Sequence, residues 1–319
     1  MLMFCGLLAA GCSGTTGGDR PDADAVLLLD FSPNAVHSGI YLTEAREYDD
    51  AEGVRLRIRK PGASTDPLKL LQSGRADLAI LDIHDLGLAR ERGRDLVGVM
   101  ALVQRPLAAV LAQPEVRRPR DLAGRRAGVT GLPSDDAVLR SVVAGDGGDP
   151  DRVRSTTIGF QAVRALLAGR VDAATAFRNV EGVALRARRP EIREFRVEDF
   201  GAPAYPELVL CVRRRTLDER RPLVRAVIRA LRRGYEQVQA DPASAVAAMV
   251  EEERGLDREV LDAQLDAVAP AFTAGAQGFG QLRADVLRRW AAWDFEFGIL
   301  KREPDVAEAF DLRVAEPES

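Results

Sequence analysis

The chain has 319 residues, of which 46% are hydrophobic and 29% charged, and its formal net charge is -4. This composition excludes disordered and fibrous proteins, and the length allows two lobes with separate cores. Only three lysines occur, so the basic residues are almost all arginines, spread over many segments. We therefore interpret runs such as residues 213–215 as solvated surface and expect no nucleic-acid partner; a phosphate-binding role is the alternative.

The N-terminus has the features of a lipoprotein signal. Residues 1–10 are apolar but too few to span a bilayer, and small residues precede Cys12, as a lipoprotein signal peptidase requires. Ala9 stands where leucine is usual, and no lysine or arginine precedes the apolar run, an absence that an upstream translation start would explain. We predict a signal peptide over residues 1–11, lipidation of Cys12 and a flexible tether over residues 12–24. A frayed cytosolic N-terminus is the alternative.

This interpretation places the protein in the cell envelope, lipid-anchored to the outer face of the cytoplasmic membrane or in the periplasm. Cys5 would leave with the signal peptide and Cys12 would carry the lipid. Cys211 then remains, inside an apolar run, as a small buried hydrophobe. With one cysteine left, we expect no disulfide and no catalytic cysteine. With only two histidines, we expect no zinc or other metal site. We also expect no cofactor.

After the tether, strands and helices alternate, which is the pattern of a mostly parallel sheet covered on both faces. The strands are expected at residues 25–29, 55–60, 77–81, 96–103, 108–112, 126–129, 152–158, 172–176 and 205–212. Helices are expected between them at residues 38–48, 66–73, 85–92 and 160–168, with another that follows residues 131–136 and ends at 143. The last third should be helical, at residues 224–239, 243–253, 258–269 and 281–298, with Trp290 and Trp293 as packing anchors.

Two stretches of the chain resemble each other. Residues 70–79 and 166–174 share a helix end, a glycine, an arginine and an aspartate before a strand of small residues. Gly74 and Gly169 would each supply the left-handed residue that ends the helix. This repetition predicts a duplicated, two-lobed binding protein, although each copy alone could be ordinary helix capping. We expect the lobes to be divided as residues 25–105 (lobe 1, first part), 106–206 (lobe 2) and 207–319 (return to lobe 1 and C-terminal helices).

Residues 29–41 join the first strand to the first helix and carry an aromatic ring, a carboxamide and an imidazole. In open α/β sheets ligands bind at the carboxyl ends of strands, where the following helix also directs unpaired N–H groups. The motif therefore predicts a small-molecule site. It is equally compatible with an ordinary loop in which Asn34 caps the helix and His37 lies in the first turn.

The same motif resembles the first-strand signature of solute-binding proteins that deliver thiamine pyrimidine precursors to ABC importers (the NMT1/THI5-like family). Residues 133–139, 170–183 and 199–209 resemble later parts of that family in order, so the resemblance spans residues 27–212. It implies an α/β fold of the periplasmic-binding-protein-like type II, with two interleaved lobes and mostly parallel sheets. It also implies a non-catalytic monomer that captures a heterocycle and passes it to a membrane permease with its ATPase.

The site residues that the motif and the resemblance suggest carry aromatic or polar side chains near strand ends. Phe31 would contact the ligand's ring face, Asn34 and His37 its polar edges, and Glu181 two ring-edge N–H groups. Two further pairs are Ser134 and Asp135, facing the ligand from lobe 2, and Asp82 and His84, just past a strand end. Arg178 would stack on the ligand or pair with an anionic group. For every one except Asn34, His37 and Glu181, a structural role stays equally open, as when His84 caps the next helix.

Two departures from the family pattern bear on the ligand. Arg178 stands where a tryptophan is frequent, and residues 82–85 differ from the family's aromatic-Gln-Glu run. A different heterocycle, or one with an acidic group, therefore stays open, as do riboflavin, sulfonate and nitrate-type solutes. The remaining alternative is a pyrimidine synthase, but the chain lacks that enzyme's cysteine cluster and has no lysine near His84 that could form a Schiff base.

Overall fold

The structure, a computed structural model, describes residues 23–61 and 67–314. The predicted signal peptide, Cys12 and nearly all of the predicted tether lie outside these described residues. Within the described ranges, no helix is both long enough and apolar enough to cross a membrane.

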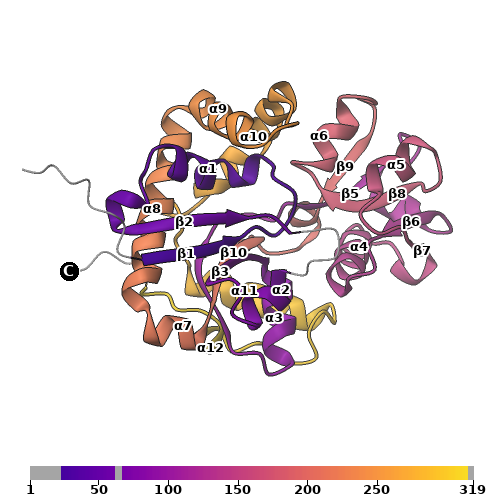
Figure 1. The fold of residues 1–319 in the computed structure, drawn as a ribbon. Helices are drawn as coiled ribbons and strands as arrows, with labels where there is room; N and C mark the ends of the chain where they lie inside the picture. The colour runs from indigo at the N-terminus through magenta and orange to yellow at the C-terminus, as the bar shows by residue number, and fades with distance from the viewer. Residues whose placement is uncertain (1–22, 62–66, 315–319) are drawn as a thin grey trace, which may run out of the picture.

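Two five-stranded mixed sheets form the centres of two lobes that lie side by side (Figure 1). The first sheet has the order β2-β1-β3-β10-β4 and the second the order β7-β6-β8-β5-β9. The strands of lobe 1 are β1 (Ala23–Leu28), β2 (Val54–Arg59), β3 (Leu78–Asp82), β4 (Leu96–Ala101) and β10 (Leu208–Arg213). The strands of lobe 2 are β5 (Ala108–Ala112), β6 (Arg126–Val129), β7 (Arg154–Thr157), β8 (Ala173–Phe177) and β9 (Arg193–Arg196).

The chain passes between the lobes twice, from β4 to β5 and from β9 to β10. The strands that follow these passages, β5 and β10, run antiparallel to both of their neighbours, while the other four strands of each sheet point the same way. The predicted α/β fold with two interleaved lobes is thus confirmed. The predicted lobe boundaries at 105/106 and 206/207 stay a prediction; they fall within the two connecting segments.

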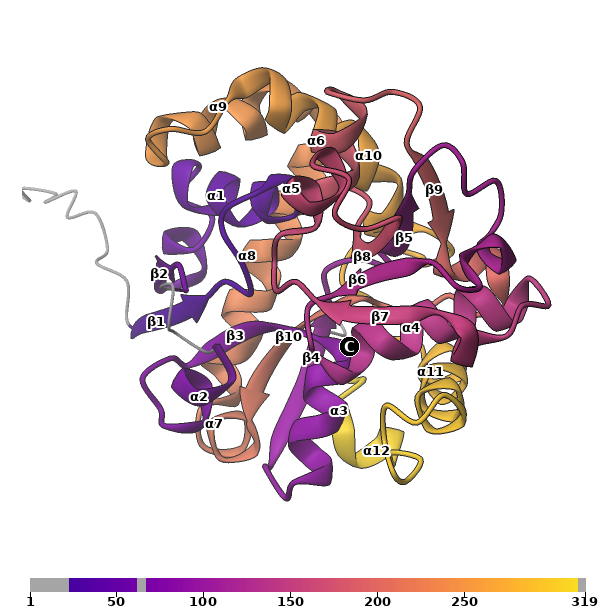
Figure 2. The same cartoon turned by 90° about the vertical axis from the view of Figure 1, so that its right-hand side faces the viewer.

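Alternating side chains of the strands bury two faces of each sheet. In β1, Ala25 and Leu27 face one core while Leu28 faces another. The first core of lobe 1 is covered by α1 (Ser38–Ala45), α8 (Arg221–Ala240), α9 (Pro242–Glu252) and α10 (Arg258–Thr273). The second is covered on the lobe 1 side by α2 (Pro67–Gln72), α3 (Ile83–Glu91), α11 (Ala284–Glu296) and α12 (Val306–Ala309), and it continues into lobe 2, where Val110 and Val138 belong to it. In lobe 2, α4 (Pro133–Gly145) lies on one side of the sheet and α5 (Ala162–Leu167) and α6 (Glu181–Arg186) on the other (Figure 2).

Most of the expected elements are found, with small shifts at their ends. Gly74 and Gly169 follow α2 and α5 with φ values of 76° and 64°, so both have the predicted left-handed conformation. The helix expected from residue 85 begins at Ile83, because the Asp82 side chain accepts a hydrogen bond from the backbone N–H of His84 and caps it.

Three short elements were not predicted from the sequence: β9, α7 (Arg214–Glu219) and α12. In β9 only Phe195 is fully buried, and three of its four residues are charged. Such an edge strand has no alternation of apolar and polar residues that a sequence pattern could reveal.

Candidate functional site

The turn after β1 is held by its own side chains. The Asn34 carboxamide accepts a hydrogen bond from the N–H of Val36 (3.0 Å) and donates one to the carbonyl of Ser32 (3.0 Å). The bond from Val36 caps the short 3-10 helix η1 (Ala35–His37). Asn34 therefore caps the helix, as in the ordinary loop that the sequence also allowed. One amide hydrogen of this buried side chain has no partner within the turn and is left for a ligand.

His37 supports a neighbouring carboxylate. Its ring is completely buried, and Nδ1 accepts a hydrogen bond from the N–H of Asn34 (3.2 Å). Because Nδ1 accepts, the proton of the ring is on Nε2, which donates to Oδ1 of Asp30 at 2.8 Å. Both nitrogens are occupied, so His37 orients Asp30 and is poorly placed to read a ligand directly. Asp30 keeps 14% of its side chain exposed just after β1. It was not among the predicted site residues.

An aromatic pair joins the two lobes. Phe31, in the turn after β1, contacts Phe160, in the connection between β7 and α5, with ring centroids 5.8 Å apart and planes tilted by 46°. Phe31 was predicted to contact a ligand and lies at the lobe boundary. Phe160 was missed, because nothing in its local sequence indicates a contact with a residue that is far away in the chain.

Two carboxylates of lobe 2, Asp135 and Glu181, lie near enough to influence each other. Asp135 follows β6 and accepts hydrogen bonds from the N–H (2.8 Å) and the hydroxyl of Thr130. Glu181 begins α6 after β8, which is the neighbour of β6, and its Oε2 accepts from the N–H of Phe177 (3.2 Å). Burial raises the pKa of Glu181 and the Asp135 charge adds to this, while the backbone N–H groups of Glu181 and Phe177 oppose it. Ser134 is partly exposed in the first turn of α4.

Arg178 forms a hydrogen bond between the lobes. Its guanidinium is largely buried, and Nη1 donates to the carbonyl of Ala267 in α10 at 3.1 Å. Burial lowers the pKa of Arg178, and the nearby Arg196 lowers it further. The side chain therefore links lobe 2 to lobe 1 in this structure, a contact that the sequence did not predict.

A buried cluster of ionisable groups lies where the chain crosses between the lobes. The Glu207 carboxylate accepts hydrogen bonds from the N–H groups of Leu107 (2.7 Å) and Ala108 (3.0 Å), so it ties the return passage to the outward passage. His84 is 1% exposed, with its Nε2 3.9 Å from Oε1 of Glu207. On its other side, Nδ1 lies 2.8 Å from Oδ1 of Asp294 and 3.2 Å from Nε1 of Trp290.

The charges in this cluster favour a protonated His84. Burial lowers the pKa of His84, but the carboxylates of Asp294, Asp82 and Glu207 outweigh this effect and raise it to about 10. Burial raises the pKa of both Asp82 and Glu207, the Glu207 charge raises that of Asp82 as well, and the two neighbouring carboxyl groups can share one proton.

Ligand atoms of Asp82, His84 and Glu207 lie within 4.8 Å of one another, and these three residue types can hold a cation. The His84 imidazolium supplies a positive charge at that point and opposes the binding of a cation.

Comparisons with known proteins agree with this architecture. The NMT1/THI5-like family profile matches residues 34–245. A formylaminopyrimidine-binding protein of Halalkalibacterium halodurans is 32% identical over 253 residues, which cover 78% of this chain and 77% of the relative. A 4-amino-5-hydroxymethyl-2-methylpyrimidine phosphate synthase of Aspergillus parasiticus is 21% identical, over 70% of this chain and 69% of the enzyme.

Among solved structures, the periplasmic aliphatic sulphonate-binding protein SsuA of Escherichia coli superposes with a TM-score of 0.73 at 16% identity, covering 94% of this chain and 96% of SsuA. This likeness shows the periplasmic-binding-protein fold. The family profile covers well over half of the chain, and the bacterial binding protein matches most of it. The chain therefore belongs to the NMT1/THI5-like family.

Proposed function

We propose that the protein is the extracytoplasmic substrate-binding component of an ABC importer and that it captures a small planar heterocycle, most consistently a thiamine pyrimidine precursor. The observation that carries the proposal is that unlike groups follow the carboxyl ends of strands in both lobes, while Phe31 contacts Phe160 of lobe 2. An aromatic ring and a carboxylate, Phe31 and Asp30, follow β1, and two carboxylates, Asp135 and Glu181, follow β6 and β8. Flat heterocycles with amino groups need this combination of ring face and acceptors.

The chemistry of an aminopyrimidine matches these groups. Glu181 has one oxygen bound to the N–H of Phe177, so its other oxygen is free to accept from an exocyclic amino group or a ring N–H. Asp30, held by His37, supplies a second acceptor from lobe 1. A ligand that contacts both lobes favours the lobe arrangement that fits it, by its higher affinity for that state. The ligand-bound form would then engage a membrane permease, with the protein acting as a monomer and catalysing nothing.

Calorimetry tests this proposal. We expect 4-amino-5-hydroxymethyl-2-methylpyrimidine, or its aminomethyl or formylamino relative, to bind at micromolar concentration or below and to raise the melting temperature, as any ligand specific for the native state does. Mass spectrometry of material that co-purifies with the protein would identify the natural ligand. Binding of only riboflavin, sulfonates or nitrate would reject the pyrimidine assignment, and binding of none of these compounds would reject the importer role.

The match to pyrimidine synthases keeps an enzyme as the second candidate. His84 is poorly suited to reach a substrate, because it is buried and the N–H at Nδ1 already donates to Asp294. An absorbance band from a bound cofactor in the purified protein would support the enzyme and contradict the binding protein.

We also propose the lipid anchor at Cys12, supported by the apolar run and small residues before it. A radiolabelled fatty acid fed to the native host should label the wild-type protein and the Cys5→Ala variant equally, because Cys5 is removed with the signal peptide. Cys12→Ala should remain unlabelled. Labelling of Cys12→Ala, or no labelling of the wild type, would show that the anchor is absent.

A further inference from the structure

Phe160 is an unusually exposed aromatic residue in the described part of the chain. Its relative exposure is 68%, against 51% for Phe295 and 42% for Leu132 and Val260, the other large apolar residues that are exposed there. A single exposed apolar side chain is common and needs no explanation by itself. Its position is informative, because the ring contacts Phe31 of the opposite lobe.

The Phe31 and Phe160 rings lie too close together for a ligand ring to fit between them. A flat ligand ring needs about 3.5 Å to an aromatic face on each side, so two phenyl rings that hold it between them stand about 7 Å apart and nearly parallel. In the structure the centroids are 5.8 Å apart and the planes are tilted by 46°. A separation larger by roughly 1 Å, together with a rotation of one ring, would convert the contact into a slot for one planar ring.

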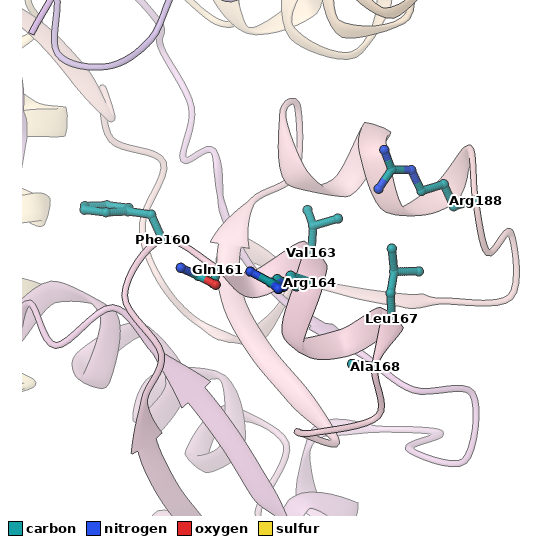
Figure 3. A pocket seen from close by; sticks show the side chains of 7 residues that line it. All are labelled: Phe160, Gln161, Val163, Arg164, Leu167, Ala168 and Arg188. Atoms are coloured by element: carbon teal, nitrogen blue, oxygen red, sulfur yellow. The ribbon is translucent and has the colours of Figure 1, made fainter. Parts of the chain in front are cut away.

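The surroundings of Phe160 allow this movement. The preceding Gly159 has a φ of 57°, in the left-handed region, and no atom lies close to where its Cβ would be. On the side of α5, Phe160 borders an open surface hollow of about 810 Å³ whose lining also includes Gln161 and Arg164. Figure 3 shows the Phe160 ring at the edge of this hollow, pointing away from the other lining side chains. The ring therefore has room to withdraw from Phe31 without displacing packed core residues.

We propose that Phe160 is the lobe 2 half of an aromatic clamp: it rests against Phe31 when the site is empty and stacks on a planar heteroaromatic ring that enters between them. The inference rests on the proposed function and deepens it, because it requires a ligand with two unhindered flat faces. Aliphatic sulfonates and nitrate have no aromatic ring to stack between the two phenyl rings, so the clamp would discriminate against them. The polar edge of the ring would then be read by carboxylates such as Glu181.

Binding measurements on Phe160 variants test the clamp with 4-amino-5-hydroxymethyl-2-methylpyrimidine as the probe. Stacking of a nucleobase-like ring on an aromatic side chain is worth about 5- to 100-fold in affinity, so Phe160→Ala should raise Kd by a factor in that range. Phe160→Leu keeps apolar bulk without an aromatic face, so its Kd should lie between those of the wild type and Phe160→Ala. Phe160→Tyr should bind like the wild type. Phe295→Ala is the matched control, since Phe295 is an exposed phenylalanine on α11, and its Kd should not change.

The empty protein gives a second readout that needs no ligand. By X-ray scattering, Phe160→Ala and Phe31→Ala should have a larger radius of gyration than the wild type and Phe295→Ala, because the contact between the lobes is lost. An unchanged radius for both variants would overturn the closed empty state. An unchanged Kd for Phe160→Ala, with a wild type that binds the probe, would overturn the stacking role and leave the proposed function standing. A wild type that binds no aminopyrimidine would overturn both the proposed function and the stacking.

Discussion

Glu181→Gln is expected to weaken binding of the aminopyrimidine by about 10- to 100-fold, because it replaces a charge-assisted acceptor by an amide that offers an N–H to the ligand's own donors. The glutamine oxygen can still accept from the N–H of Phe177, so the first turn of α6 keeps its bond. Since burial raises the pKa of Glu181, its ionised form is stabilised less in the folded protein than in water. Removing the charge should therefore leave the melting temperature unchanged or slightly higher.

The pH dependence of binding provides a further check on Glu181. A carboxyl group whose pKa is raised from 4.5 loses its charge as the pH falls through that raised value, so the wild type should lose its advantage over Glu181→Gln on acidification. Both Kd values are measured by calorimetry between neutral and mildly acidic pH. Protonation of the ligand affects both equally, so it cancels in their ratio. Glu191→Gln, an exposed residue of the turn after α6, is the control and should bind like the wild type. Equal affinities of Glu181→Gln and wild type at neutral pH would contradict the assignment.

The fold follows closely from local sequence patterns. The repeated Gly-Arg-x-Asp stretches mark the same helix-to-strand turn in both lobes, and the left-handed conformations of Gly74 and Gly169 agree with it. Buried strands such as β4 and β5 are continuous apolar runs bounded by turn residues, which makes them visible without any alignment. The edge strand β9 lacks such a run, and only its pairing with β5 defines it.

Strand topology accounts for the positions of some candidate site residues. Asp135 and Glu181 follow the adjacent parallel strands β6 and β8, so their proximity follows from topology. The partners that were missed come from distant segments: Phe160 meets Phe31 through tertiary structure, and Asp294 meets His84 across 210 positions. Asp294 did leave one signal, because it lies four residues after Trp290 and hence on the same buried face of α11.

Removal of the Glu207 carboxylate is expected to give the largest loss of stability among these variants. In Glu207→Ala the N–H groups of Leu107 and Ala108 lose their acceptor inside the protein, and His84 loses one of its three carboxylate neighbours. Leaving buried polar and charged groups without partners costs about 3–5 kcal/mol, so the free energy of unfolding should fall by that amount at neutral pH. Urea denaturation followed by circular dichroism measures the change.

Two variants make the Glu207 prediction specific. Glu207→Gln keeps an oxygen that can accept from both N–H groups, so it should lose much less stability than Glu207→Ala. Glu219→Ala removes one side of an exposed pair with Arg215 and should change the free energy of unfolding by about 0.5 kcal/mol or less.

The pKa of His84 is raised from 6.5 to about 10, so its stabilising contribution is complete below pH 6.5 and is lost as the pH rises through about 10. Glu207→Gln removes one cause of that rise, and its stability should therefore begin to fall at a lower alkaline pH than that of the wild type. Equal denaturation midpoints for Glu207→Ala and Glu207→Gln at neutral pH would show that the carboxylate does not hold the two passages together.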